Sequence, residues 1–196
     1  EFKDLKVGME KKDEATGKTE LVLEPGKREM AVYDLLRHTS GLTYGFARSP
    51  IEDLYNAAKV FDWNQTNAEL ITKLSKLPLR FQPGTTWEYS LSTDVLGRIV
   101  EVVSGMSFDA FIHERITKPL NQPDTGFWAE GTRRQERVAE LPQPSPFAQD
   151  VTKPNKWLSG GGGLVSTAAD YARLCQMFLN GGRLDGVHLV SHKTVE

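Results

Sequence analysis

The chain has 196 residues, 39% apolar and 26% charged, which is typical of a globular domain with a substantial buried core. Its 24 basic and 26 acidic residues give a formal net charge of −2 without a long run of either sign, so we expect neither nucleic acid nor an anionic membrane surface as a partner. No apolar run approaches the roughly 18 residues that a membrane-spanning helix needs, so we expect no membrane span. The compartment stays open between cytoplasm and periplasm.

Both ends of the sequence predict a fragment. The chain starts at Glu1 rather than at a methionine. It stops at Glu196, about one turn into a helix that the pattern predicts from Ser191. We therefore expect part of one domain, residues 1–196, whose missing N- and C-terminal segments belong to the same protein.

Residues 1–30 predict a hairpin and its lead-in to the rest of the chain. Two moderately β-like arms, from Val7 to Glu24, flank the turn-rich centre Ala15-Thr16-Gly17. Pro25-Gly26 then ends the hairpin.

Residues 31–120 predict a lobe built mostly from helices that short polar loops connect. These helices are expected at Met30–Arg37, from Ser49 or Pro50 to Val60, from Thr66 to Leu74 with a Thr66/Glu69 capping box, at Asp94–Ser104, and after Ser107 with Phe108 and Phe111 in the core. The buried face of the first helix is expected to hold Met30, Val32 or Tyr33, Leu35 and Leu36. Gly41 suits the left-handed conformation that ends helices.

Three of the histidines invite a functional interpretation. His38 lies two residues from Ser40, but residues so close at a helix end do not easily face each other as base and nucleophile. The sequence therefore favours a His38 that complements the helix dipole. His188 and His192, four residues apart, could share a metal ion, but no third ligand is evident, so we expect no metal site.

Residues 121–159 predict a long irregular loop, and residues 160–196 predict a glycine-rich turn and a helix. The run Gly160–Gly163 lacks the Lys-Ser/Thr of a phosphate-binding P-loop, so close backbone packing is its expected role. Thr167 caps a helix through Leu179. The buried stripe of this helix is expected to hold Tyr171, Leu174, Phe178 and Cys175, the last as a buried structural thiol.

The stretch from Gln82 to Ser104, QPGTTWEYSLSTDVLGRIVEVVS, is the most informative in the chain. A Pro83-Gly84 turn leads to Tyr89, and apolar residues at helical spacing follow, so Tyr89 lies where a helix begins. Its side chain would be held on rigid structure beside an opening. From these residues alone, a tyrosine whose ring covers a buried surface is the other interpretation.

Three stretches, in their order and spacing, carry a family resemblance. They are LLRHTSGLTYG from Leu35 to Gly45, FQPGTTWEYSLSTDVLGRIVEVVSGMSFDAFIHERITKPL from Phe81 to Leu120, and GGGGLVSTAADYARLCQMFLNGG from Gly160 to Gly182. Together they resemble the serine β-lactamase and penicillin-binding superfamily, in the branch of class C β-lactamases, D-alanyl-D-alanine peptidases and family VIII carboxylesterases.

The resemblance implies both a fold and a mechanism. In this family a helical lobe is inserted into an α/β lobe, so we expect a chain that is mainly α with minor β: the helical lobe plus the return toward the α/β lobe. A serine of an S-x-x-K motif forms an acyl-enzyme, and a tyrosine acts as general base. Tyr89, in Tyr89-Ser90-Leu91, matches that tyrosine. A free phenol has a pKa of about 10, so such a base needs nearby cations, which would be the family's lysines.

Two departures from the family pattern narrow the implied function. No S-x-x-K occurs in the 196 residues, so the nucleophile would precede Glu1, and the K-T-G-type strand would follow Glu196. The third position of the tyrosine motif, Asn in most class C β-lactamases, is Leu91, which resembles the Y-S-L form of family VIII esterases. The resemblance therefore implies a carboxylesterase that acts on short acyl esters, with the fragment alone inactive. A β-lactamase or D-alanyl-D-alanine carboxypeptidase, or a non-catalytic binding domain, are the alternatives.

The implied reaction needs no cofactor and no metal. In this chain its catalytic residue would be Tyr89, while Ser90, Leu91, Trp87 and Phe46 are expected to contact a small-molecule ester or β-lactam-like substrate because they lie close to motif positions.

Overall fold

The computed structural model describes residues 2–12, 14, 17, 19–140 and 149–196. The chain divides into two compact units. One comprises Glu1–Ile99 with Ser159–Gly161, and the other comprises Val100–Leu158 with Gly162–Glu196. Helix α4 (Ser92–Ser104) therefore begins in the first unit and ends in the second.

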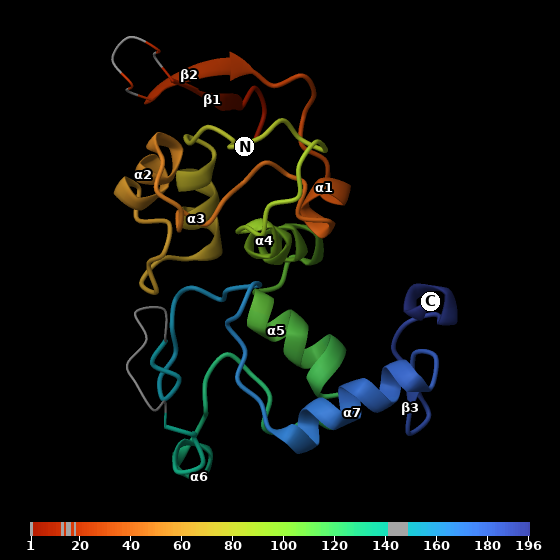
Figure 1. Cartoon of the computed structure of the whole chain (residues 1–196). Coiled ribbons are helices and arrows are strands. Elements are labelled where there is room, and N and C mark those ends of the chain that lie inside the picture. Colours follow the sequence, from red (N-terminus) through yellow and green to blue (C-terminus); the bar gives the residue numbers. More distant parts are fainter. Residues whose placement is uncertain (1, 13, 15–16, 18, 141–148) are drawn as a thin grey trace. The chain divides into compact units, whose positions relative to one another are not determined.

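A hairpin opens the first unit (Figure 1). Strands β1 (Lys6–Lys12) and β2 (Thr19–Pro25) pair antiparallel, in a register that sets Lys6 opposite Pro25. The predicted hairpin is thus confirmed. Its expected turn residues Ala15-Thr16 lie outside the described residues.

Helices α1 (Val32–Leu36), α2 (Pro50–Ala57) and α3 (Asn67–Leu74) precede α4 in the first unit. The capping box of α3 is confirmed: Glu69 N–H donates to Thr66 Oγ1 over 3.2 Å, and Thr66 N–H donates to Glu69 Oε2 over 2.7 Å. The core of the unit gathers buried apolar side chains from all of its parts: Leu42, Ile51, Tyr55, Leu70, Leu74, Leu79, Leu91 and Val95.

Helix α1 differs from its prediction in the face that it buries. Leu35 is buried, but Val32, Tyr33 and Leu36 are all more than half exposed. The buried partner of Leu35 on this short helix is Asp34, whose carboxylate binds Arg28. An ion-paired residue has thus taken an inward position that the apolar pattern assigned to its neighbours.

The regular elements of the second unit follow one another along the chain: α5 (Phe108–Ile112), a π-helical turn (His113–Thr117), α6 (Thr132–Gln135), α7 (Ala168–Leu179), β3 (Arg183–Leu184), β4 (Val187–His188) and α8 (His192–Val195). In the described part of the chain, helices dominate over two small two-stranded sheets, as expected for a mainly α chain with minor β. None of these helices combines the length and the apolar character that crossing a membrane requires.

Buried aromatic residues of the second unit come from its irregular segment. Phe127 and Trp157 are only 4% and 1% exposed. Phe108 and Phe111 of the helical region, which we expected in the core, are half-buried. A loop that contributes its own aromatic side chains to a core is fixed by packing rather than by regular hydrogen bonding.

Helix α7 also turns a face inward that its pattern did not predict. The expected burial is wrong for Tyr171 and Phe178, which are 62% and 46% exposed, and for the exposed Cys175, while Leu174 is half-buried. Met177 and Asp170 are buried instead. Periodicity identifies an apolar stripe, but its burial depends on what packs over it, and in the described part of the chain this stripe remains open.

Candidate functional site

Tyr89 lies in the first unit, on the segment that joins the Pro83-Gly84 turn to α4. Its side chain is 55% exposed. The ring centroids of His38, Tyr44 and Trp87 lie 4.9, 5.2 and 6.4 Å from the Tyr89 ring. Aromatic rings at these separations attract one another. Tyr89 therefore presents an accessible phenol on a base of packed rings.

The turn before Tyr89 is fixed by an ion pair. Gly84 has a φ of +84° and donates its N–H to Thr39 O over 2.7 Å. A Cβ atom at Gly84 would collide with the Arg28 guanidinium, which donates to both carboxylate oxygens of Asp34 over 2.7 Å. The hydrogen bond from Arg28 lowers the pKa of the buried Asp34. Position 84 therefore requires glycine, because of its positive φ and because the Arg28 guanidinium occupies the space of a Cβ atom.

His38 holds the main chain on both sides of Tyr89. The His38 carbonyl accepts from Glu88 N–H over 2.8 Å, and its Nδ1 accepts from Ser90 N–H over 3.3 Å. His38 follows α1 with a φ of +54°, so its ring turns toward Tyr89. The expected dipole role needs a protonated ring, whereas Nδ1 can accept only when it carries no proton. The structure thus makes His38 a support for the Tyr89 segment.

Three buried serines lie beneath this segment. Ser92 Oγ lies 2.8 Å from both Ser40 Oγ and Ser90 Oγ, and all three side chains are fully buried. Leu91 is also fully buried in the core. Ser90 and Leu91, which we expected to contact substrate, therefore point into the unit, and their side chains are not open to a ligand in this structure.

Glu88 is anchored through its side chain as well. Arg80 Nη1 donates to Glu88 Oε1 over 2.7 Å and to Glu52 Oε1 over 2.9 Å. Glu52 is fully buried on α2 and also accepts from Thr43 Oγ1 over 2.8 Å. Charged groups buried in this way need such partners. Arg80 thereby ties the residue before Tyr89 to helix α2.

The glycine run closes over the start of α4. Ser159 Oγ donates to Asp94 Oδ1 over 2.6 Å, and Gly161 N–H donates to the same oxygen over 3.3 Å. Burial raises the pKa of Asp94. A Cβ at Gly160 would collide with the Thr93 carbonyl, and one at Gly161 would lie 2.9 Å from Asp94 Oδ2. The predicted role in close backbone packing is confirmed for Gly160, whereas Gly161 meets side chains and Gly162 has open space beside it.

Tyr44 is a neighbour of Tyr89 that sequence reasoning missed. Burial raises the pKa of Tyr44. The negative charge of Asp94, and the charge interaction and hydrogen bond with Tyr89, raise it further. Tyr44 therefore stays protonated at pH values where an ordinary phenol begins to ionise. The stretch LLRHTSGLTYG contained a signal for this residue, but the family resemblance assigned no role to it.

The rings of Phe46 and Phe61 extend the group away from Tyr89. Phe46 stacks on Tyr44 with a centroid distance of 5.1 Å, and Phe61 stacks on Phe46 at 5.3 Å. Phe46 and Trp87, both expected near substrate, are 58% and 65% exposed. The structure thus brings Phe46, Trp87 and Tyr89 together on the open side of the first unit.

This arrangement suits proton transfer by the accessible phenol of Tyr89.

The described part of the chain holds no group of three or more His, Cys, Asp or Glu side chains that could bind a metal ion. His192 instead lies 3.1 Å from the Glu196 carboxylate, and His188 belongs to strand β4.

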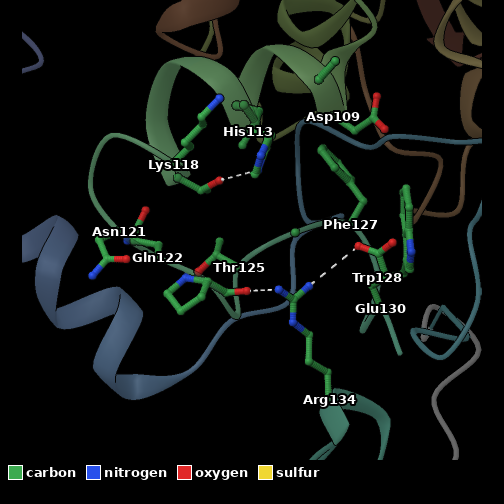
Figure 2. Close-up of a pocket in the computed structure, with 15 residues that line it drawn as sticks. Asp109, His113, Lys118, Asn121, Gln122, Thr125, Phe127, Trp128, Glu130 and Arg134 are labelled. Carbon is green, nitrogen blue, oxygen red and sulfur yellow. Dashed lines mark hydrogen bonds and ion pairs between the residues drawn. The ribbon is translucent and has the colours of Figure 1, made fainter. Parts of the chain in front are cut away.

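A cavity of about 520 Å³ lies in the second unit (Figure 2). Figure 2 shows Arg134 reaching into it, where the guanidinium meets the Pro123 carbonyl and the Glu130 carboxylate. Lys118, which also lines the cavity, pairs with Glu114 over 2.8 Å. No predicted site residue lines this cavity, so it does not contribute to the candidate site.

Residues 20–195 match the family model described as Beta-lactamase. Protein Rv1367c of Mycobacterium tuberculosis is 36% identical over 191 residues, which cover 93% of this chain and 47% of that protein. Esterase EstB of Burkholderia gladioli is 30% identical over 169 residues, which cover 74% of this chain and 43% of EstB. The chain spans about half the length of the curated relatives it matches.

The fold has a solved counterpart in unliganded simvastatin synthase (LovD) from Aspergillus terreus, as its selenomethionyl derivative. The TM-score is 0.72 at 23% identity, and the alignment covers 99% of this chain and 48% of that one. At this identity the likeness establishes a common fold.

Proposed function

Since the chain belongs to the beta-lactamase family, we propose that it carries the general base of a serine hydrolase whose reaction passes through an acyl-enzyme. The observation that supports this most directly is the environment of Tyr89. Tyr89 is more than half exposed, while His38 bonds the main chain on both sides of it and Ser92 and Arg80 bond the side chains of the flanking Ser90 and Glu88. A base has to be accessible and yet fixed in position.

In the proposed reaction, Tyr89 moves one proton in each half. To accept a proton, the Tyr89 oxygen must start as the phenolate, which the family's lysines outside these 196 residues would stabilise. A serine, also outside these residues, attacks the ester carbonyl, its proton passes to the phenolate oxygen, and that oxygen returns it to the leaving alcohol. Water then attacks the acyl-enzyme, again with Tyr89 as proton acceptor, and the acid and the free serine are released. Tyr44 does not compete as a base, because burial raises its pKa and keeps its proton in place.

The substrate class that we propose is the short acyl ester. Tyr89-Ser90-Leu91 resembles the Y-S-L form of family VIII esterases, and EstB, one of the relatives, is an esterase. Phe46 and Trp87 have the exposure that contact with substrate requires. We assign the buried Ser90 and Leu91 to supporting Tyr89 rather than to binding the ester.

Mass spectrometry of a reacting protein tests this proposal. A protein of the relatives' length that contains this chain should hydrolyse p-nitrophenyl acetate and carry one acetyl group per molecule when quenched during turnover. The 196-residue chain alone should do neither, because it contains no S-x-x-K serine.

Other outcomes would identify the alternative functions. A stable adduct with a labelled penicillin, without ester turnover, would support a β-lactamase or D-alanyl-D-alanine carboxypeptidase. A longer protein that forms neither adduct would be a binding domain that uses the same fold, and the proposed hydrolase function would then be wrong.

A further inference from the structure

Tyr44, Phe46 and Phe61 form a layered group of rings, which we call the aromatic shelf. The planes of Tyr44 and Phe46 are within 10° of each other at a centroid distance of 5.1 Å. Phe46 and Phe61 follow at 5.3 Å and 29°, and Tyr44 and Phe61 at 5.6 Å and 35°. Near-parallel planes at this spacing are a favoured arrangement of aromatic rings. The three rings therefore form one packed aromatic surface, of which Phe46 is the most exposed member.

Hydrogen bonds fasten the base of the shelf to helix α2. Asn56 Nδ2 donates to the Gly45 carbonyl over 2.9 Å, between the two shelf residues Tyr44 and Phe46. Thr43 Oγ1 donates to the buried Glu52 over 2.8 Å. A surface that is already ordered loses less entropy when a ligand binds.

Phe46 is the exposed member of the shelf, Tyr44 and Phe61 are half-buried, and the group is uncharged and adjoins Tyr89. Phe46 is 58% exposed, and the Tyr44 ring lies 5.2 Å from the Tyr89 ring. Burial raises the pKa of Tyr44, so this member also carries no charge near neutral pH. Aromatic rings attract flat aromatic groups through offset stacking, beyond the gain from apolar burial.

We propose that the aromatic shelf binds a flat aromatic group on the alcohol side of the ester substrate. This inference rests on the proposed function, in which Tyr89 returns a proton to the leaving alcohol. The alcohol side of the ester must then lie beside Tyr89, where the shelf begins. The substrate class is thereby narrowed to short-chain esters of aromatic alcohols.

Matched esters test the shelf in a protein of the relatives' length that contains this chain. Benzyl acetate and cyclohexylmethyl acetate share an acyl group and similar bulk but differ in aromaticity, and ethyl acetate lacks the ring. We expect kcat/KM for benzyl acetate to exceed that for cyclohexylmethyl acetate by about fivefold, because stacking adds to simple apolar burial.

Substitutions at Phe46 separate ring stacking from apolar contact. Phe46→Leu keeps the bulk but removes the ring, so the benzyl preference should fall to about one, mainly through a higher KM. Phe46→Ala should raise KM for both ring esters by about tenfold, a larger increase than for ethyl acetate, which has no ring to lose contact with the shelf. Phe178→Leu, at an exposed aromatic of α7, is the matched control and should change none of these values.

The failure of the shelf and the failure of the proposed function give different results. If the wild-type protein hydrolyses none of the three esters, the hydrolase proposal is wrong. NMR on the 196-residue chain tests ligand binding to the shelf independently of catalysis. Benzyl acetate should shift the ring signals of Tyr44 and Phe46 more than cyclohexylmethyl acetate does. Equal shifts, or a benzyl preference that survives Phe46→Leu, would overturn the shelf inference.

Discussion

Tyr89 and Tyr171 are exposed to similar extents, 55% and 62%, but the two regions that carry them are built differently. Beneath Tyr89, buried polar side chains from distant parts of the sequence meet, as Ser40 and Ser92 do across 52 positions. Tyr171 stands on the regular helix α7, next to the buried Asp170, whose carboxylate accepts from Asp124 N–H and Thr125 Oγ1 across 46 and 45 positions. Exposure and long-range polar contacts are common to both regions, so it is the packing of the His38, Tyr44 and Trp87 rings against Tyr89 that distinguishes its segment.

The largest expected difference between the two regions is in activity. Tyr89→Phe keeps the ring and removes the phenol oxygen, so ester hydrolysis by the longer protein should fall by about 10²- to 10⁴-fold. Tyr171→Phe makes the same chemical change on α7 and should leave the rate unchanged. Initial rates with p-nitrophenyl acetate measure both, and circular dichroism verifies folding. A Tyr89→Phe protein with wild-type rates would remove the distinction between the two tyrosines.

Stability should separate the two regions by a smaller amount. Ser92→Ala leaves the buried hydroxyls of Ser40 and Ser90 without a shared partner, so the free energy of unfolding should drop by about 1–3 kcal/mol. Thr167→Ala removes the cap of α7 and should cost about 1 kcal/mol. Urea unfolding of the 196-residue chain compares them. A larger loss from Thr167→Ala would mean that the serine cluster is not the stronger support.

The support that His38 gives to Tyr89 predicts a split between two variants. His38→Asn keeps a hydrogen-bond acceptor and a residue that tolerates a φ of +54°, so kcat should stay within about threefold of wild type. His38→Phe keeps an aromatic ring but removes the acceptor for Ser90 N–H, and kcat should fall by about tenfold. A larger loss of kcat in His38→Asn than in His38→Phe would show that ring contact, and not the hydrogen bond, is what matters.

The smallest expected effect is a pH dependence from Asp34. Its pKa is lower in the folded chain because of Arg28, so the ion pair stabilises the fold above the unfolded value of about 3.9 and this contribution is lost as the pH falls through the folded value. Melting temperatures of wild type and Asp34→Asn should therefore differ at pH 6. The difference should begin to shrink only below about pH 4. Arg28 is about half exposed, so solvent screening keeps the effect modest.

A gap between the two melting temperatures that widens below pH 4 would contradict this sign. Asp94 offers a comparison of opposite direction within the same unit. Burial raises its pKa, so the cost of keeping its charge buried is relieved as the pH falls.

Elements that depend on neighbouring residues were predictable from the sequence. The Thr66/Glu69 capping box and the Thr167 cap join residues three positions apart, and the β1–β2 hairpin joins adjacent segments. The position of Tyr89 at the start of a helix followed from the Pro83-Gly84 turn and the apolar spacing after it, and α4 begins at Ser92.

Features that depend on distant contacts were not predictable in this way. Burial of Asp34 beside Leu35 requires Arg28 and the turn at Gly84, and no periodicity encodes that meeting. The open stripe on α7 shows the converse case, because an apolar pattern cannot state what covers it. The stacking of Tyr44, Phe46 and Phe61 likewise depends on how residues 43–45 are tied to α2.

The contact between Ser159 and Asp94 has a consequence for how the chain matures. Their hydrogen bond spans 65 positions, so the start of α4 is completed only after Ser159–Gly161 has left the ribosome and returned. Until then, the Asp94 carboxylate lacks this protein partner and remains hydrated. The hydrogen bonds among Ser40, Ser90 and Ser92 can thus form early in synthesis. The hydrogen bond between Ser159 and Asp94 at the start of α4 forms late.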